Sequence, residues 1–449
     1  MVYRSQERRN DGKGYEKRIQ RFMFVMGDFP NPSQTFILRE MACLREKGVD
    51  FSVVAEKRVP NSDLGPTIKS IQDDAYYLPS KTRIAFCAAT FFVRHPLWTA
   101  TLIAWAMRLP HRTLFHRARF LGTLMSAMAM APRLSKLGVE RLHAHFAGFQ
   151  TELAMCLSNL LDIPYGVSWH AYGIWKDRNI LEEKLSGADT IITCTKYNAD
   201  HLRQLAPQRA NDIHMVNHGI DVDKLQPEEL KPQKTPLVLA VGRLIPKKGL
   251  KYLLHAAALL KAEGVTFRMT IVGDGPEKES LIQIANTLNL ERSVTFTGAL
   301  PNQEVLKLIN DAYMLVAPSV RDEHGNIDGI PNVLIEAMAL ERPVIGSDLS
   351  GIPEVVTEYT GLLVPPGSVS DMALAIKRML TDRQLALKCG KAGRAVVERT
   401  FNIEINVTKQ LEILKNLYSK QAVPLITAHE RVCPRKNMID DTERRKKGA

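Results

Sequence analysis

The stretch LVLAVGRLIPKKGLKYLLHAAALLK, which begins at Leu237, decides the fold class. Its first five residues are apolar and favour a strand, Gly242 ends that run, and a helical pattern follows Gly249. A buried strand that passes through a short basic loop into a helix is typical of a strand-helix-strand unit, from which parallel sheets are built.

The same rhythm extends on both sides of this stretch. Several of the runs lack polar alternation, as expected of strands that are covered by helices on both faces. The predicted strands are 22–27, 51–56, 190–195, 237–242, 268–273, 293–298, 313–319 and 343–348. We therefore predict an α/β protein of two facing Rossmann-like domains, whose ligand lies in the cleft at the carboxyl ends of the strands.

A polar segment divides the two halves. DKLQPEELKPQKTP, which begins at Asp223, carries three prolines and is typical of a linker. The expected organisation is a flexible basic N-terminus (1–18), an N-terminal domain that binds the acceptor (19–225), a linker (226–236), a C-terminal domain that binds the nucleotide sugar (237–398), a helix that can return to the first domain (399–420) and a polar tail (421–449).

The composition is that of a folded protein. The 449 residues are 45% hydrophobic and 24% charged, which excludes collagen-like, coiled-coil and wholly disordered chains. The 60 Lys and Arg residues exceed the 48 Asp and Glu residues, so the net charge is +12. This excess favours an anionic partner: nucleic acid, acidic lipid or a phosphorylated substrate.

The cysteines and the apolar runs predict a cytosolic chain. The six cysteines are scattered, with no CxxC pair and no spacing that suggests a zinc site, which indicates reduced thiols. The first twenty residues contain no apolar core of a signal peptide, so we expect no cleaved leader. The most apolar region, 84–107, is interrupted by Arg94, His95 and Pro96, and we expect no transmembrane helix.

Charge is distributed unevenly along the chain. Residues 75–139 include nine Lys or Arg and no Asp or Glu. With its apolar runs, this region fits a surface that lies on an anionic membrane. It fits equally an insertion over about 82–135 whose apolar face packs on the N-terminal sheet while its cations are solvated. The basic tail lacks any nucleic-acid-binding motif, so no specific nucleic acid is expected.

Two cations stand at the carboxyl end of strand 237–242. Arg243 can hold a phosphate through two hydrogen bonds, and Lys248 adds a point charge. A pyrophosphate group is the ligand expected at these two cations. Taken alone, the two residues would by default be interpreted as surface cations beside a turn.

The stretch DGIPNVLIEAMA, which begins at Asp328, adds a second anion-binding element. Pro331 suits the first helical position, which leaves the amide hydrogens of Asn332 and Val333 unpaired at a helix N-terminus. Asp328 and Glu336 are eight residues apart, so they address different parts of a ligand. A carboxylate that accepts two hydroxyl groups suits a ribose or a hexose, and the apolar neighbours of Glu336 favour a buried partner.

Together these motifs resemble glycosyltransferase family 4, which has the GT-B fold. The resemblance rests on GRLIPKKG, GDGPEKESL, VTFTG, LVAPS and DGIPNVLIEAMA, and it runs from about Pro236 to about Met379. In the first half, FPNPSQTFILREMACLREKGVDFSVVA, RLHAHFAG, YGVSWHAYGIW and NHGIDVDKL resemble members that build bacterial exopolysaccharide and lipid-linked saccharides.

The resemblance implies roles for individual residues. Arg243 and Lys248 would hold the donor diphosphate with the amides of Asn332 and Val333, and Glu336 would hold the ribose.

Further roles concern the donor sugar and the base. Asp328 would touch the sugar hydroxyls, and His170 in SWHAYG would line the reaction centre. The segment from Phe296 to Leu300 would flank the base.

The chain departs from the family pattern at two places. The first acid of the pair is usually Glu and is Asp328 here, one methylene shorter, which affects the sugar preference. The loop GDFPNPSQT lacks the Gly-Gly of many relatives, and Ser33 and Thr35 can substitute for it.

No obligatory metal is expected, since two cations and a helix N-terminus can stabilise a departing diphosphate. His143 and His145, at strand spacing on one face, form a weak metal candidate, and a loop or core role fits them better because no third ligand is evident. His170 alone would be a structural histidine, and the resemblance favours its place in the site.

The sequence thus predicts a retaining GT-B glycosyltransferase that moves a hexose from a nucleoside-diphosphate sugar to a saccharide acceptor, on a polyprenyl carrier at the cytoplasmic membrane face. No cofactor beyond the donor substrate is expected. Two alternatives remain: a sugar-nucleotide epimerase of the same fold, and a non-catalytic scaffold whose basic surface binds membrane or nucleic acid.

Overall fold

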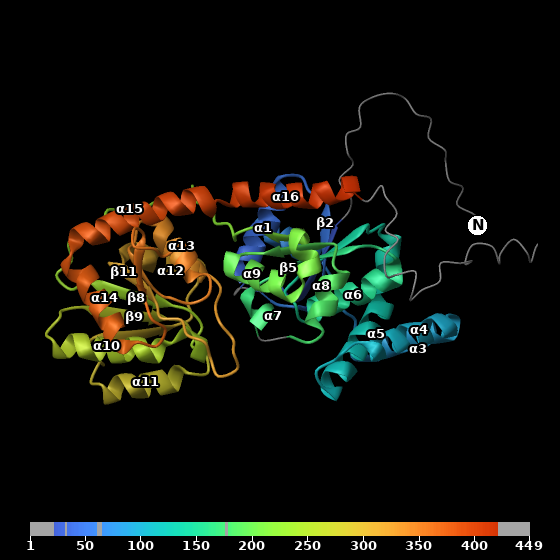
Figure 1. Ribbon diagram of the computed structural model, residues 1–449, viewed down its shortest axis with the longest axis horizontal. Helices are drawn as coiled ribbons and strands as arrows, with labels where there is room; N and C mark the ends of the chain where they lie inside the picture. Colours follow the sequence, from blue (N-terminus) through green and yellow to red (C-terminus); the bar gives the residue numbers. More distant parts are fainter. Residues whose placement is uncertain (1–21, 32–33, 61–64, 176–177, 421–449) are drawn as a thin grey trace, which may run out of the picture.

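The computed structural model describes residues 22–31, 34–60, 65–175 and 178–420, without the side chains of 172 and 415–420. The predicted flexible N-terminus (1–18), the polar tail (421–449), Ser33 and Cys433 lie outside the described residues. The rest forms two lobes, each a parallel sheet between layers of helices (Figure 1). The predicted α/β class with two Rossmann-like domains is therefore confirmed.

The first lobe is built on a seven-stranded sheet in the order β3-β2-β1-β4-β5-β6-β7. Its strands are β1 (Phe22–Phe29), β2 (Phe51–Arg58), β3 (Tyr76–Tyr77), β4 (Arg141–His145), β5 (Tyr165–Trp169), β6 (Thr190–Thr193) and β7 (Ile213–Met215). Its helices are α1 (Thr35–Glu46), α2 (Pro66–Asp73), α3 (Lys81–Arg94), α4 (Pro96–Arg108), α5 (Leu114–Lys136), α6 (Phe149–Leu161), α7 (Ala171–Trp175), α8 (Leu181–Gly187), α9 (Lys196–Leu205) and the 3-10 turn η2 (Pro207–Asp212).

The second lobe is built on a six-stranded sheet in the order β10-β9-β8-β11-β12-β13. Its strands are β8 (Leu237–Val241), β9 (Arg268–Val272), β10 (Val294–Gly298), β11 (Met314–Ala317), β12 (Val344–Ser347) and β13 (Gly361–Val364). Its helices are η3 (Pro246–Lys248), α10 (Leu250–Ala262), α11 (Lys278–Thr287), α12 (Asn302–Asp311), α13 (Asn332–Ala339), η4 (Ile352–Glu354), α14 (Val369–Thr381) and α15 (Arg383–Thr400). The segment 226–236 before β8 contains no helix or strand.

The last helix, α16 (Ile403–Lys420), crosses from the second lobe to the first and packs on α1 (Figure 1). Its apolar side chains Ile403, Val407 and Leu414 join the core between α1 and the first two strands. Hydrophobic burial on this face therefore fastens the chain end to the first lobe.

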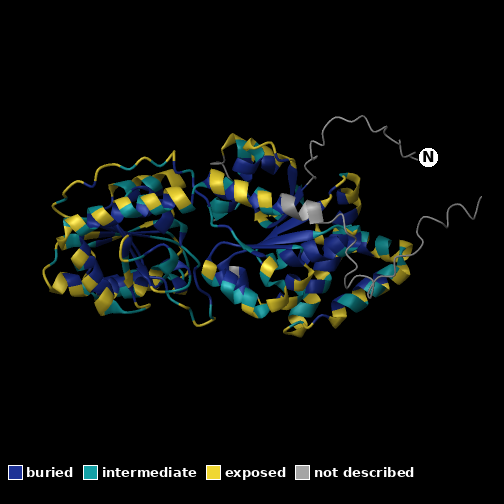
Figure 2. Cartoon of the chain, turned by 45° about the horizontal axis from the view of Figure 1, so that its top comes forward, coloured by how far each residue is buried: buried dark blue, intermediate teal, exposed yellow. Residues whose placement is uncertain are grey.

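The central strands of both sheets are buried, and many exposed residues lie on the outer faces of the helices (Figure 2). Central strands such as β8 are almost wholly apolar, because helices cover both of their faces. The predicted strands omitted β3, β4, β5, β7 and β13. Of these, β4 carries Arg141, His143 and His145 inside the fold. With three polar residues in five, its sequence lacks the continuous apolar run from which a buried strand is predicted.

A buried ion-pair network ties α5 to the rest of the first lobe. The Glu152 carboxylate on α6 accepts from Lys184 at 3.0 Å and from Arg119 of α5 at 3.1 Å. The amide of Asn179 donates to the same oxygen at 3.1 Å. The charge of Glu152 is therefore compensated in the interior, and the helical region 81–136 is anchored through α5.

Candidate functional site

The basic loop after β8 holds the first part of the site. Lys247 and Lys248 form the turn η3, and Gly249 follows with φ +63°. A Cβ atom at Gly249 would lie 2.0 Å from the Pro318 carbonyl oxygen, so only glycine fits between this turn and the end of β11. The turn places Lys248 at the carboxyl end of the sheet, while the Arg243 side chain is exposed at the same edge.

Asp328 lies between the two lysines. Its carboxylate accepts from Lys247 at 2.9 Å and from Lys248 at 2.8 Å, and the Ser319 hydroxyl donates to it at 3.0 Å. Burial alone would raise the pKa of Asp328, but the two ammonium groups outweigh burial and hold that pKa well below its usual range. Burial lowers the pKa of Lys247, and Asp328 offsets part of that effect.

A cavity of about 280 Å³ lies beside this cluster at the carboxyl ends of β8 and β11. It is lined among others by Gly242, Lys248, Ser319, Pro331 and Val333. Helix α13 begins at Asn332, so Pro331 stands just before the helix rather than at its first position. The cavity thus combines an ammonium group with a helix N-terminus, and both attract an anion.

Glu336, on α13, is buried and pairs with an arginine of the other lobe. The Arg39 guanidinium on α1 lies 2.6 Å from its carboxylate. The second lobe also reaches the first through Glu354, whose carboxylate accepts from the backbone N–H groups of Lys196 and Tyr197 at 2.8 and 2.9 Å. The two lobes are therefore in contact around the site.

His170 follows β5 directly and begins a row of imidazoles. Its Nδ1 lies 2.9 Å from Nε2 of His218, and its Nε2 lies 3.4 Å from Nδ1 of His145. The other nitrogen of His218 lies 3.4 Å from Oδ1 of Asn332 at the start of α13. Burial lowers the pKa of His170 and His145 far below the usual value and that of His218 to about 4, so the three rings are neutral at physiological pH.

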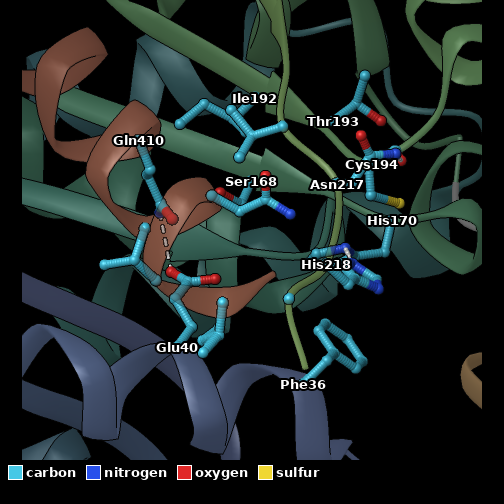
Figure 3. A pocket seen from close by; sticks show the side chains of 15 residues that line it. Phe36, Glu40, Ser168, His170, Ile192, Thr193, Cys194, Asn217, His218 and Gln410 are labelled. Atoms are coloured by element: carbon cyan, nitrogen blue, oxygen red, sulfur yellow. Dashed lines mark hydrogen bonds between the residues drawn. The ribbon is translucent and has the colours of Figure 1, made fainter. Parts of the chain in front are cut away.

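His170 and His218 line a cavity of the first lobe that α16 covers on one side (Figure 3). On its far side Glu40 accepts a hydrogen bond of 2.8 Å from Gln410 of α16. Burial raises the pKa of Glu40 to about 7, and the bond from Gln410 opposes that shift. Phe36 stacks on His218 with ring centroids 4.0 Å apart and closes the cavity from α1.

The remaining predicted residues lie farther from this centre. Thr35 is the first residue of α1 and is half-buried. Phe296, on the edge strand β10, packs on the core of the second lobe, as does Leu300 just after it. His143 is buried and lies 2.8 Å from the Ser168 hydroxyl through Nε2.

Sequence reasoning missed four polar residues of the site: Arg39, Glu40, Lys247 and His218. Lys247 is adjacent to the predicted residue Lys248. The signal for it is Asp328, because a buried carboxylate needs cations to compensate its charge. His218 stands in the quoted NHGID segment. Nothing local to the FILRE segment indicated that Arg39 would meet a residue 297 positions away.

Two facing Rossmann-like lobes with cations, acids and a helix N-terminus at their cleft define the GT-B class of glycosyltransferase. Residues 33–224 match the family model Glycosyltransferase Family 4, and residues 221–396 match Glycosyl transferases group 1. The chain belongs to these glycosyltransferases, as the resemblance predicted.

Curated relatives are named for exopolysaccharide synthesis. The chain is 37% identical over 197 residues to the putative colanic acid biosynthesis glycosyltransferase WcaL of Escherichia coli, covering 43% of this chain and 48% of that protein. It is 33% identical to the amylovoran biosynthesis glycosyltransferase AmsK of Erwinia amylovora, covering 46% and 52%. The chain therefore spans about half the length of these two relatives.

Solved structures share the fold at low identity. Sucrose-phosphate synthase from Thermosynechococcus elongatus superposes with a TM-score of 0.68 at 20% identity, covering 89% of this chain and 100% of that chain. Anabaena HepE in complex with UDP gives 0.66 at 15% identity, covering 88% and 100%.

Proposed function

We propose that this chain transfers a hexose from a nucleoside-diphosphate sugar, with retention of anomeric configuration, to a lipid-linked saccharide in the synthesis of exopolysaccharide or another cell-surface glycan. The observation that carries the proposal is the cavity at the ends of β8 and β11, where Lys248 faces the start of α13 beside the buried carboxylate of Asp328. Retention is part of the proposal and is what the resemblance to the family implies.

The chemistry of transfer explains this choice of residues. As the sugar leaves, negative charge develops on the diphosphate, and preorganised cations and amide hydrogens stabilise that charge in the transition state. Arg243, Lys248 and the amides of Asn332 and Val333 supply these groups. We therefore expect transfer to continue in the presence of a chelator.

The two acids would bind hydroxyl groups of the donor. Asp328 is held by two ammonium groups and keeps its charge at neutral pH, so it accepts from a sugar hydroxyl. Glu336 would hold the ribose, and the ribose hydroxyls then have to replace Arg39 as its partners. His170 would line the sugar from the first lobe.

Similar proteins support the classes of donor and acceptor. One, 28% identical over 249 residues, is a GDP-mannose-dependent phosphatidylinositol monomannoside mannosyltransferase of Mycobacterium tuberculosis. The name of that enzyme combines a nucleotide-sugar donor with a lipid-linked acceptor. The structure of HepE was solved with UDP-glucose.

The donor class is tested by thermal shift. One of the UDP-, GDP- or ADP-sugars is expected to raise the unfolding temperature, since a ligand at a hundred times its dissociation constant adds about 2.7 kcal/mol of stability. The same ligand should not shift Arg243→Ala. The absence of a shift with all three donors, or release of an altered sugar without an acceptor, would contradict the proposal.

We also propose that helices α3 to α5 dock on the cytoplasmic membrane face. Nine of the fourteen exposed large hydrophobic side chains among the described residues lie in 86–125, including Phe86, Leu97 and Phe115. Exposed cations such as Arg83 and Arg94 accompany them. The other faces of these helices pack into the first lobe, at the end far from the second lobe (Figure 1). None of the described helices has the length and apolarity to cross a bilayer.

Replacing both Leu97 and Phe115 with glutamate is expected to reduce sedimentation with anionic vesicles at least about tenfold, because each buried methylene contributes about 0.8 kcal/mol and the new charges are repelled. Leu374→Glu, at an exposed position of the second lobe, is the matched control and should sediment like the wild type. Equal sedimentation with neutral and anionic vesicles would contradict docking.

A further inference from the structure

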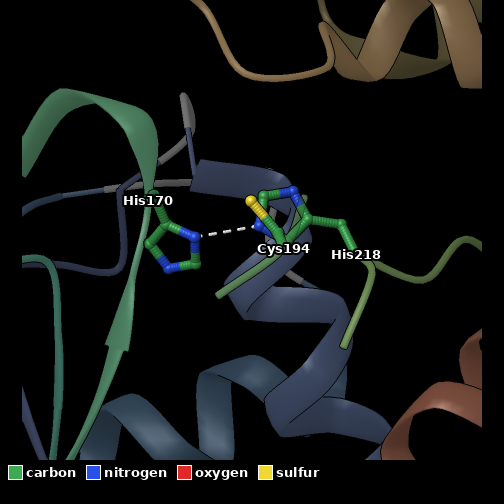
Figure 4. A group of neighbouring side chains, drawn as sticks. All are labelled: His170, Cys194 and His218. Atoms are coloured by element: carbon green, nitrogen blue, oxygen red, sulfur yellow. Dashed lines mark hydrogen bonds between the residues drawn. The ribbon is translucent and has the colours of Figure 1, made fainter. Parts of the chain in front are cut away.

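Three side chains that can bind a metal stand at the ends of three neighbouring strands. His170 follows β5, Cys194 follows β6, and His218 lies three residues after β7. These strands are adjacent in the sheet, so their carboxyl ends meet at one edge. One imidazole nitrogen of each histidine and the Cys194 sulfur all lie within 4.8 Å of one another (Figure 4).

The outer nitrogens of both histidines have partners that can accept a hydrogen bond. Nδ1 of His218 lies 3.4 Å from the Asn332 side-chain oxygen, and Nε2 of His170 lies 3.4 Å from Nδ1 of His145. His145 in turn presents its Nε2 to the Glu40 carboxylate at 3.7 Å. When each ring places its hydrogen toward these partners, the inner nitrogens of His170 and His218 both keep a free lone pair.

Those inner nitrogens face each other at 2.9 Å. Without a metal, one of them must carry the hydrogen that the other accepts. Metal-bound histidines characteristically donate their second N–H to a carboxylate, a carbonyl or another acceptor, which fixes the ring and its tautomer. His145 beside His170, and Asn332 beside His218, stand in the positions of such acceptors.

We propose that His170, Cys194 and His218 form a binding site for a zinc ion, with its fourth position open to the cavity that these three side chains line. Two imidazoles and one thiolate are ligands that Zn²⁺ prefers, and three protein ligands leave one tetrahedral position free. That cavity is also lined by Phe36, Thr193 and Asn217.

Binding releases one proton. Burial raises the pKa of the Cys194 thiol to about 12, so the free thiol is protonated. On coordination the Sγ–H bond breaks, the sulfur–zinc bond forms with the thiol electron pair, and the proton leaves to solvent. Each imidazole remains neutral and keeps one hydrogen. The ring that donated between the two inner nitrogens now carries its hydrogen on the outer nitrogen, and the other ring carried it there already.

The site lies where the proposed function places the donor sugar. Zinc would hold His170 and fill the space beside the start of α13, so the zinc-loaded protein should transfer sugar more slowly than the metal-free protein. This consequence for activity rests on the proposed function, whereas zinc binding itself does not.

The test uses Co²⁺ as a spectroscopic probe of zinc on the full chain, after treatment with a chelator. We expect thiolate-to-cobalt charge-transfer absorption and intense four-coordinate ligand-field bands, saturating at one ion per chain and bleached by Zn²⁺. Cys194→Ser should lose the charge-transfer band, and His218→Gln should weaken Co²⁺ binding by at least about tenfold. Cys87→Ser, a half-buried thiol on α3, is the matched control and should keep the wild-type spectrum.

A wild-type spectrum without the thiolate band would overturn the proposal, as would a band that survives in Cys194→Ser and disappears in Cys87→Ser. Circular dichroism and the His218→Gln titration separate lost binding from misfolding. If Co²⁺ binds with the expected spectrum and Zn²⁺ displaces it, but the zinc-loaded protein transfers sugar as fast as the metal-free protein, then the place given to His170 is contradicted and the metal site is not.

Discussion

Replacing Arg243 with alanine is expected to lower the turnover number by about 10²–10³-fold while leaving the unfolding temperature near that of the wild type. The loss follows because removing one preorganised group that stabilises developing charge typically costs that much in rate. Stability is spared because the Arg243 side chain is exposed. Steady-state kinetics with the donor found by thermal shift, together with a melting curve, measure both quantities.

Lys248→Ala should reduce turnover to a similar degree, but it also removes one of the two cations that hold Asp328. Its melting temperature should therefore fall more than that of Arg243→Ala. Lys251→Ala is the matched control, since Lys251 is an exposed cation on α10 three residues further on. Arg243→Lys keeps the charge without the paired hydrogen bonds, so an intermediate rate is expected. Wild-type turnover in both alanine variants would remove the diphosphate assignment.

The sequence predicted those parts of the fold whose signal is local. Strands such as β8 and β11 are continuous apolar runs, because both faces of each are covered, and their type and place were found. Strand β4 was missed because it carries polar side chains inside the fold. Their partners lie close in space but far along the sequence. His143 meets Ser168 of β5, for example, and Arg141 pairs with Asp189.

The candidate site divides in the same way. Arg243, Lys248, Asp328 and Glu336 stand in two short motifs whose chemistry is readable without a structure. The partner of Glu336 was expected to be buried, yet its identity depends on α1 approaching α13 from the other lobe. The row of histidines likewise depends on strand order, since nothing in the spacing of 170, 194 and 218 shows that β5, β6 and β7 are adjacent.

Asp328→Asn is expected to destabilise the second lobe by about 3–5 kcal/mol, the usual cost of removing one partner from a buried ion pair. Asparagine keeps the shape but leaves Lys247 buried without a counter-charge, since Lys247 has only 7% of its side chain exposed. Denaturant unfolding followed in the second lobe measures the loss. Glu263→Gln breaks the exposed pair with Lys377 and is the matched control, with an expected loss below about 1 kcal/mol.

The stability difference between wild type and Asp328→Asn should also depend on pH, and this dependence gives a sharper test. The pKa of Asp328 is lowered in the folded protein, so its stabilising contribution is complete above the unfolded value of about 3.9 and is lost as the pH falls from there toward the folded value. The gap in stability between wild type and Asp328→Asn should thus stay constant from about pH 8 to about pH 5 and narrow only in stronger acid.

Asp328→Glu completes the series because it restores the longer acid that the family usually carries. The charge remains, so the lysines keep their counter-ion, but the added methylene must fit between Ser319 and the two ammonium groups, at an expected cost of about 1–3 kcal/mol. Two results would show that the carboxylate of Asp328 is not the charge that holds Lys247 in the interior. One is an equal loss of stability in Asp328→Asn and Asp328→Glu. The other is a stability difference between wild type and Asp328→Asn that already becomes smaller between about pH 8 and about pH 6.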